Sequence, residues 1–376
     1  MKTAEEVPFV AFSVKVWKFM GFLFATKYSN QRYFFLLINV ALNISQFAYL
    51  FTEEKLDKLI LNGYFTVWYF NCIMRVVIVL KRQKDYEDCI HKLVRLYNFI
   101  ETTGDEYMVN LLQEVGKKAH RFSIMNVCLS LTTGACFLIY PVFTGMQDLP
   151  YGVYVPFLNT SNRFTYKLLY LYEILATPPG VTLYIPFSNL VISFFLFAHT
   201  LMQILRYKLN ILMDPEKDQD EKMTEKKLKI AIKYHQVLIV LIDDINSLVV
   251  SVSFIEIIFF TMLLCALLFV LNIVELLPQI CLSCLYIVLI MTQLFTLYWG
   301  ANEVTVESLK VREALYDMPW YNMNEKCKKL LLIVMIRSSR PLQIVAGNIY
   351  PVTLQMFQSL ANVSYSYFTI LRRVYQ

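Results

Sequence analysis

The sequence has little charge, little glycine or proline, and few histidines. Charged residues make up 17% and hydrophobic residues 57% of the 376 positions, whereas soluble domains carry about 25% charged and about 45–50% apolar residues. With 10 Gly and 12 Pro, the chain is neither collagen-like nor of low complexity. A soluble globule could not bury this much apolar surface and a bilayer could, so the composition indicates a membrane protein.

Constellations that carry chemistry are also missing. The four His are scattered along the chain and no nucleophile–base arrangement is visible, so we expect neither an enzyme nor a metal or cofactor site. The eight Cys do not cluster in one loop as a disulfide framework would. A net charge of +6 is small for this length and does not suggest a nucleic-acid partner.

The N-terminal apolar stretch, Phe9 to Ala25, does not read as a cleavable signal peptide, because it carries Lys15 and Lys18. On a helix, its large apolar residues share one face and Lys18 lies opposite. That pattern fits a helix lying on the membrane surface, or an amphipathic helix packed on the protein. The apolar face consists of Phe9, Phe12, Val16, Met20 and Leu23.

Seven apolar stretches approach the roughly 20 residues that a spanning helix needs. We expect all of them to be helical, because lipid offers backbone groups no hydrogen-bond partner. The predicted spans are Tyr33–Phe51, Leu59–Leu80, Phe122–Phe143, Val181–Leu205, Ser253–Asn272, Leu277–Tyr298 and Val345–Leu371.

The distribution of Lys and Arg predicts a cytoplasmic N-terminus. Of those outside the spans, 28 fall in segments that this topology leaves in the cytoplasm and 6 in segments on the other side. The sequon at Asn159, a predicted glycosylation site, lies in a loop that the same topology places outside. This orientation is the reverse of a G-protein-coupled receptor, and no internal repeat of the kind found in secondary transporters is visible.

The predicted fold is therefore an all-α membrane protein with seven transmembrane helices and a cytoplasmic helical anchor region built from extensions of spans 4–7. No Pro or Gly interrupts Thr224 to Asn272, so a helix of about 70 Å would extend from span five into the cytoplasm. A second helical segment would end at Pro319. These segments would form a packed helical body shared between subunits, or simply long loops.

The expected regions are a cytoplasmic N-terminal segment with an interfacial helix (1–32), spans 1–4 (33–205), a cytoplasmic helical extension (206–252), spans 5–6 (253–298), cytoplasmic anchor helices (299–344), and span 7 with a short extracellular C-terminus (345–376).

Polar residues inside the spans are few. Arg75 and Glu256 lie toward the cytoplasmic ends of their spans, and we interpret them as snorkelling side chains rather than an ion site. The last span carries a stripe of polar residues within roughly an 80° sector of the helix. Such a stripe must face water, as in a pore, or other helices, as in a packed seam. One helix cannot enclose a pore, so several copies or partner subunits would be needed. The stripe comprises Asn348, Gln355, Ser359, Asn362, Ser366 and Thr369.

Aromatic and hydroxyl side chains recur in the outer halves of spans two, three, four and six, where no charged residue or His occurs. A pocket there would be apolar, with a few hydrogen-bonding groups, and would suit a small neutral ligand. The alternative is that these aromatics only pack the bundle. The candidate ligand-binding residues are Tyr64, Phe65, Trp68, Thr133, Phe137, Tyr140, Tyr184, Phe187, Ser188 and Tyr286.

Specific short motifs occur in the C-terminal third of the chain. They are Tyr316-x-x-Pro319-Trp320-Tyr321, Ile336-Arg337-Ser338-Ser339-Arg340-Pro341, Ala346-Gly347 with Tyr350-Pro351, and Ser364-Tyr365-Ser366-Tyr367-Phe368. In these motifs the chain resembles an insect odorant receptor, and His235-Gln236 and Leu149-Pro150-Tyr151 are similar as well. The terminal motif of the related gustatory receptors and the long second cytoplasmic insertion of the family's co-receptor are absent, so the chain resembles an odour-tuning subunit.

The resemblance implies an odorant-gated, non-selective cation channel that opens when a small neutral volatile binds. It implies assembly with the odorant receptor co-receptor into a heterotetramer, in the plasma membrane of olfactory sensory neuron dendrites. Cytoplasmic helices would make most subunit contacts, with Pro319, Trp320 and Tyr321 in this anchor. A gustatory-type chemoreceptor channel and, less favoured, a G-protein-coupled receptor are the alternatives. The seventh span would divide into a cytoplasmic piece around Glu325–Arg340 and a pore-lining piece from near Val345, with Gln355, Ser359, Asn362, Ser366 and Thr369 toward the pore.

Overall fold

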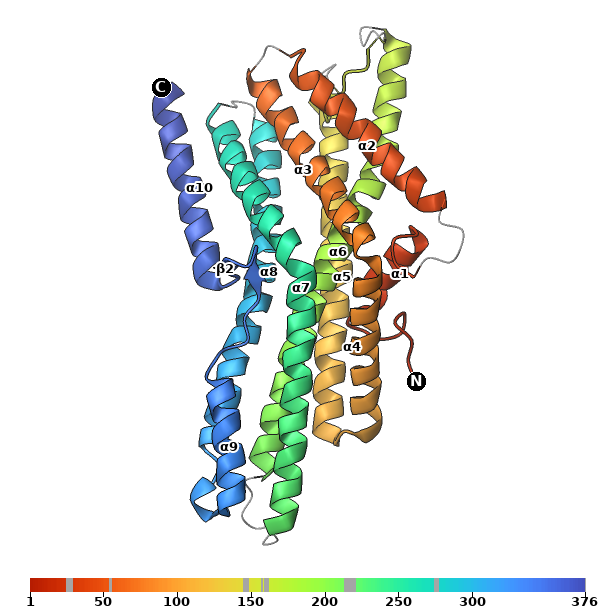
Figure 1. Cartoon of the computed structure of the whole chain (residues 1–376). Coiled ribbons are helices and arrows are strands. Elements are labelled where there is room, and N and C mark those ends of the chain that lie inside the picture. The colour runs from red at the N-terminus through yellow and green to blue at the C-terminus, as the bar shows by residue number, and fades with distance from the viewer. Residues whose placement is uncertain are drawn as a thin grey trace.

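The computed structural model describes residues 1–24, 30–53, 56–144, 149–156, 158, 162–212, 221–273 and 277–375. In these ranges the chain forms a long bundle of helices, with one short β-hairpin near its middle (Figure 1). The elements are α1 (Ala11–Phe19), α2 (Asn30–Leu50), α3 (Leu56–Lys81), α4 (Gln83–Thr103), α5 (Glu106–Thr144), α6 (Arg163–Leu212), α7 (Glu221–Ile273), α8 (Leu277–Tyr316), the 3₁₀ helix η1 (Trp320–Asn322), α9 (Glu325–Ser338), β1 (Val345–Ala346), β2 (Tyr350–Pro351) and α10 (Leu354–Tyr375).

Six of the described helices, α2, α3 and α5 to α8, are long and apolar enough to cross a membrane. They contain the first six predicted spans, so the chain is an all-helical membrane protein. Three of them begin well before the predicted span: α5 at Glu106 instead of Phe122, α6 at Arg163 instead of Val181, and α7 at Glu221 instead of Ser253. An apolar window marks only the part of a helix that lipid requires, whereas the helix itself continues wherever it packs.

Helix α6 lies at the centre of the bundle and packs against α1, α2, α3, α5, α7 and α8. Of its most apolar window, 83% is buried, compared with 28% for α2. It continues through Pro178 and Pro179, although proline usually ends a helix. Packing on several sides therefore outweighs the local preference, and α6 becomes the frame on which the other helices are positioned.

The lower half of Figure 1 contains the extended ends of α5 to α8, together with α4 and α9. The uninterrupted helix predicted over Thr224–Asn272 lies within the 53 residues of α7. Between the predicted spans two and three, residues 81–121, the sequence predicts only a cytoplasmic connection. The structure instead has helix α4 and the first part of α5 in this stretch. An apolar face at helical spacing, including Tyr86, Leu93 and Tyr97, buries α4 against the body.

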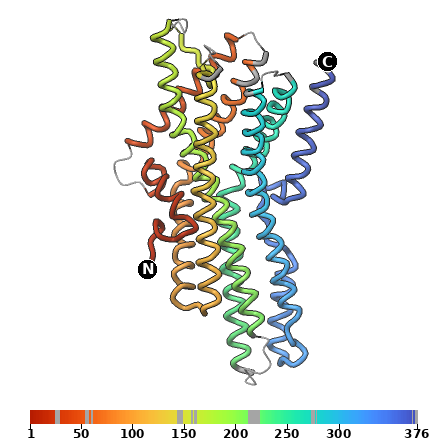
Figure 2. Tube along the Cα trace, turned by 180° about the vertical axis from the view of Figure 1, so that it is seen from behind, coloured from red at the N-terminus to blue at the C-terminus, as the bar shows by residue number. Residues whose placement is uncertain are grey.

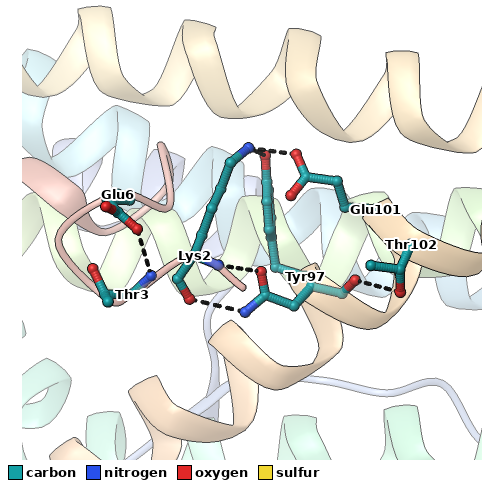
Figure 3. Close-up of polar contacts among 7 residues, drawn as sticks. Lys2, Thr3, Glu6, Tyr97, Glu101 and Thr102 are labelled. Carbon is teal, nitrogen blue, oxygen red and sulfur yellow. Dashed lines mark hydrogen bonds and ion pairs between the residues drawn. The ribbon is translucent and has the colours of Figure 1, made fainter.

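The N-terminal segment packs on the protein. Trp17 of α1 is buried and stacks on Phe187 with ring centroids 5.5 Å apart, while Lys18 stays exposed. Farther toward the N-terminus, the backbone N–H of Lys2 donates to Asn98 of α4, and the Asn98 side chain donates back to the Lys2 carbonyl, each at 2.9 Å (Figure 3). Of the two alternatives for α1, the structure therefore favours a helix packed on the protein.

The last predicted span does not begin as a helix at Val345, which corrects the sequence boundary. Strands β1 and β2 form an antiparallel hairpin, and Gly347 and Asn348 turn the chain with φ of 61° and 58°. A Cβ at Gly347 would lie 2.6 Å from the Phe254 ring, so glycine is required there. Asn348 therefore sits in a turn outside the helical stripe, and α10 begins only at Leu354.

Views from opposite sides place α10 at one edge of the bundle and the N-terminal segment at the other (Figures 1 and 2). Helix α10 packs against α7 and α8.

Candidate ligand-binding site

A buried cavity lies among α3, α5, α6, α7 and α8 and is bordered by the segment 149–156. We call this the first cavity, and the space that it leaves for the centres of water-sized molecules is about 40 Å³. None of the described residues that line it is charged or a histidine. They are Phe65, Trp68, Tyr69, Ser130, Thr133, Gly134, Phe137, Tyr151, Thr177, Val181, Ile185, Phe260, Tyr286, Leu289, Ile290 and Gln293.

Aromatic rings form one wall of the first cavity. Phe65 lies edge-on to Phe137 at 5.0 Å and to Tyr151 at 4.8 Å between ring centroids. Tyr286 lies edge-on to Phe137 at 5.9 Å. Such edge-to-face pairs fix the orientation of each ring, so this wall is preformed and offers ring faces and edges to a ligand.

The Ser and Thr hydroxyl groups of the first cavity are already engaged as donors. Ser130, Thr133 and Thr177 each donate to the backbone carbonyl four residues earlier, at 2.8–2.9 Å. Their oxygens can still accept a hydrogen bond. The side chain of Gln293, by contrast, makes no hydrogen bond to any described residue, so its carboxamide is available to a bound molecule.

The segment 149–156 covers one end of the first cavity through Tyr151. The Tyr151 hydroxyl is 2.9 Å from the Thr177 hydroxyl. The backbone N–H of Tyr151 donates to the buried Glu173 carboxylate at 3.3 Å. The Asn62 side chain donates to the carbonyl of Gly152 at 3.2 Å. Tyr151 is not among the site residues predicted from the sequence, because where a loop reaches depends on the helices that hold it.

Five of the ten predicted ligand-binding residues line the first cavity: Phe65, Trp68, Thr133, Phe137 and Tyr286. Tyr64 stands behind this wall, with its ring 4.4 Å from that of Tyr286. Tyr140 is not among the described residues that line the first cavity.

The other three predicted residues, Tyr184, Phe187 and Ser188, line a second, smaller cavity. It adjoins the first cavity, because Phe260 and Gln293 line both. The second cavity is lined by Asn126, Tyr184, Phe187, Ser188, Val191, Ile192, Val249, Val252, Ser253, Glu256, Phe260, Gln293, Leu294 and Leu297.

A buried ion pair joins Arg75 of α3 to Glu256 of α7 beside the second cavity. Arg75 is 1% exposed and Glu256 6% exposed. The Arg75 guanidinium also donates to the Ser188 hydroxyl at 2.6 Å and lies 3.9 Å from the centroid of the Tyr184 ring. The snorkelling interpretation of these two residues is therefore wrong. The helices bring the two charges together inside the protein, where each one neutralises the other.

Helix α10 is mostly exposed. Of the five predicted pore-lining residues, Gln355, Ser359, Asn362 and Ser366 are exposed and Thr369 is half-buried. The opposite face carries Met356, Phe357 and Leu360, which pack against the core. A third, small cavity lies between α7, α8 and α10, and Phe260 lines it as it lines the other two.

The predicted anchor residues lie at the turn between α8 and α9. Trp320 and Tyr321 are 46% and 66% exposed, and Pro319 is half-buried. The predicted glycosylation site, Asn159, is outside the described residues. In the described ranges, no group of three or more His, Cys, Asp or Glu side chains is placed to hold a metal ion.

Comparison with known proteins gives a consistent result. Residues 55–365 match the family model described as "7tm Odorant receptor". The chain is 36% identical to odorant receptor 10 of Aedes albopictus, over the whole of both chains, and 36% identical to odorant receptor Or2 of Anopheles gambiae, over 99% of each. Its fold is similar to that of the olfactory receptor OR5 of Machilis hrabei in complex with eugenol, with a TM-score of 0.82 over 97% of each chain at 16% identity.

Proposed function

Since this chain belongs to the insect odorant receptor family, whose members are generally odorant-binding ion-channel subunits and not enzymes, we propose that it is the odour-tuning subunit of a ligand-gated, non-selective cation channel. The observation that carries the proposal is an uncharged, aromatic cavity inside the helix bundle. This cavity shares one lining residue, Phe260, with the cavity beside the exposed polar helix α10.

The ligand in this proposal is a small neutral volatile held in the first cavity. Apolar rings would cover its body, and a few oxygen acceptors would contact its edge. A protonated amine would find no counter-ion among the described lining residues, and it would lose its hydration on entry. The cavity chemistry therefore favours neutral molecules over charged ones.

The pore in this proposal is lined by α10. Its stripe from Gln355 to Thr369 would be costly against lipid, and it points away from the face that packs on α7 and α8. Several subunits around a common axis would enclose water between such stripes. We propose that the partners are co-receptor subunits in a heterotetramer, with α10 as a seventh span and the N-terminus in the cytoplasm.

Phe260 is the proposed link between ligand and pore. It is 4% exposed and borders the first, second and third cavities, so it contacts both the ligand space and the space beside α10. A ligand that fits the first cavity better when Phe260 and α10 take their open-state positions would shift the population toward the open channel.

The remaining parts of the proposal concern assembly and location. The exposed Trp320 and Tyr321, next to Pro319, offer an aromatic surface to a neighbouring subunit at the cytoplasmic end of the bundle. Asn159 would carry a glycan on the outer side. The complete channel would reside in the plasma membrane of olfactory sensory neuron dendrites.

Whole-cell current from cells that express the chain with a co-receptor tests the proposal. Neutral volatiles should evoke a cation current, and a response that persists in full when the co-receptor pore is blocked would refute it. An epitope tag at the N-terminus should be stained only after permeabilisation, because the predicted topology places it in the cytoplasm.

A further inference from the structure

The starting point is Gln293 on α8. Its carboxamide lines both the first and the second cavity and is half-buried, and it has no hydrogen-bond partner among the described residues. The side chain is only partly shielded from solvent, and the amide hydrogen-bonding capacity that faces the cavities is not met by the protein. A bound molecule that supplies the missing hydrogen bond therefore gains affinity at this position.

The first cavity by itself accommodates an apolar body. Its Ser and Thr hydroxyls already donate to helix carbonyls, and the rest of its wall is largely aromatic or aliphatic. The oxygens of these hydroxyls can still accept a hydrogen bond. Among the Ser, Thr and Gln side chains described in this wall, however, Gln293, at the junction with the second cavity, is the one whose donor and acceptor are both unused.

The second cavity adds a carboxylate acceptor to the Gln293 amide. Glu256 lines it with a carboxylate that Arg75 neutralises, and Arg75 is itself surrounded by the Ser188 hydroxyl and the Tyr184 ring. The pair has no net charge to offer an ion. A negative ligand would meet the Glu256 carboxylate, and a positive one would have to compete with Arg75. A neutral hydroxyl could donate to the Gln293 oxygen or to the Glu256 carboxylate at no such cost.

We propose that Gln293, together with the second cavity, is the subsite for the polar group of the ligand. The ligand class is a neutral molecule with an aromatic or aliphatic body and one hydrogen-bond donor such as a hydroxyl. The inference rests on the proposed function for the identity of the first cavity as the odorant site, and it makes Gln293 a specificity-determining residue of that site.

The test compares matched triads of compounds: an aromatic alcohol, its methyl ether and the hydrocarbon of the same skeleton. Binding is measured as the shift in melting temperature of the purified full-length chain over a concentration series. Gln293→Met, which keeps the length of the side chain, should raise the half-saturating concentration of the alcohol about fivefold. The same substitution should change that of the hydrocarbon less than twofold.

The matched control is Thr292→Val on the neighbouring, exposed position of α8, which should leave all three compounds unchanged. Gln293→Leu is the second variant if the Met protein does not fold. Equal changes for alcohol and hydrocarbon, or no melting shift with any triad, would overturn the proposal.

This readout separates the subsite from the channel. If the alcohol preference depends on Gln293 but no current appears in cells with the co-receptor, the subsite stands and the channel proposal fails. If currents appear without any dependence on Gln293, the channel proposal stands and the subsite is wrong.

Discussion

Helices α6 and α10 are both long enough to cross a bilayer, but their surroundings differ. Six other helices surround α6, and 83% of its most apolar window is buried. Among the residues of α10 whose burial the structure describes, Ser364 alone is buried, and the predicted pore-lining positions face outward. The comparison indicates that the most apolar part of α6 is stabilised by packing within one chain, whereas the polar face of α10 requires water or neighbouring subunits to complete it.

The largest expected effect comes from breaking the ion pair between α3 and α7, which packs against Ser188 and Tyr184 of α6. Glu256→Gln leaves the Arg75 charge buried without a counter-ion, which we expect to destabilise the protein by about 3–5 kcal/mol. Loss of surface protein and a lower melting temperature would report it. The double substitution Arg75→Met with Glu256→Leu removes both charges and should restore most of the stability. Equal damage from the single and double variants would show that the pair is not the cause.

The sequence predicts those features of both helices that depend on spacing within one helix. The polar stripe of α10 and the aromatic faces of α3 and α5 repeat every three or four residues, so periodicity finds them. How far one helix is shifted along its neighbour cannot be read from the periodicity of either helix. For that reason Phe187 and Ser188, predicted in the same pocket as Phe65, belong to the second cavity beside Arg75.

Long-range contacts have no signal in the sequence either. The Arg75–Glu256 pair joins residues far apart in the chain, and either charge alone looks like a snorkelling side chain. The start of α10, by contrast, does carry a local signal. Gly347, Asn348 and Pro351 are turn-forming and helix-breaking residues, and together they argue for a break before the helix.

An intermediate effect is expected at Phe260 of α7, which lines both the first cavity and the cavity beside α10. Phe260→Leu should raise the odorant concentration for half-maximal current about fivefold and lower the maximal current, because a smaller side chain transmits less of the ligand contact to α10. The control is Phe194→Leu, at a buried phenylalanine of α6 that is not a described lining residue of the three cavities. Equal dose–response shifts in both variants would argue for a general packing effect.

The smallest effect is expected where α7 meets α9, at Glu225, which lines none of the three cavities. Hydrogen bonds from Lys229 and Lys326 lower the pKa of Glu225 from 4.5 to about 2. Because the pKa is lower in the folded protein, the stabilisation is complete above pH 4.5 and is lost as the pH falls toward 2. The wild type should therefore melt slightly above Glu225→Gln at pH 6, and this difference should shrink by pH 3.

The exposed Glu313 provides the matched control for that comparison, since its side chain makes no ion pair with a described residue. Glu313→Gln should melt like the wild type at both pH values. A difference between Glu225→Gln and wild type that grows toward low pH would contradict the assignment.

The most direct test of the account is thiol accessibility along α10. Single cysteines replace Ser359 and Asn362 on the polar stripe and Met356 on the packed face, in channels formed with the co-receptor, and a charged thiol reagent is applied with and without odorant. The wild type is treated in the same way, because its native exposed cysteines, such as Cys281, could also react with the reagent. We predict that reagent applied with odorant blocks current through the two stripe variants and leaves Met356→Cys unchanged. Block of Met356→Cys with no effect on the stripe variants would contradict a pore lined by this face of α10.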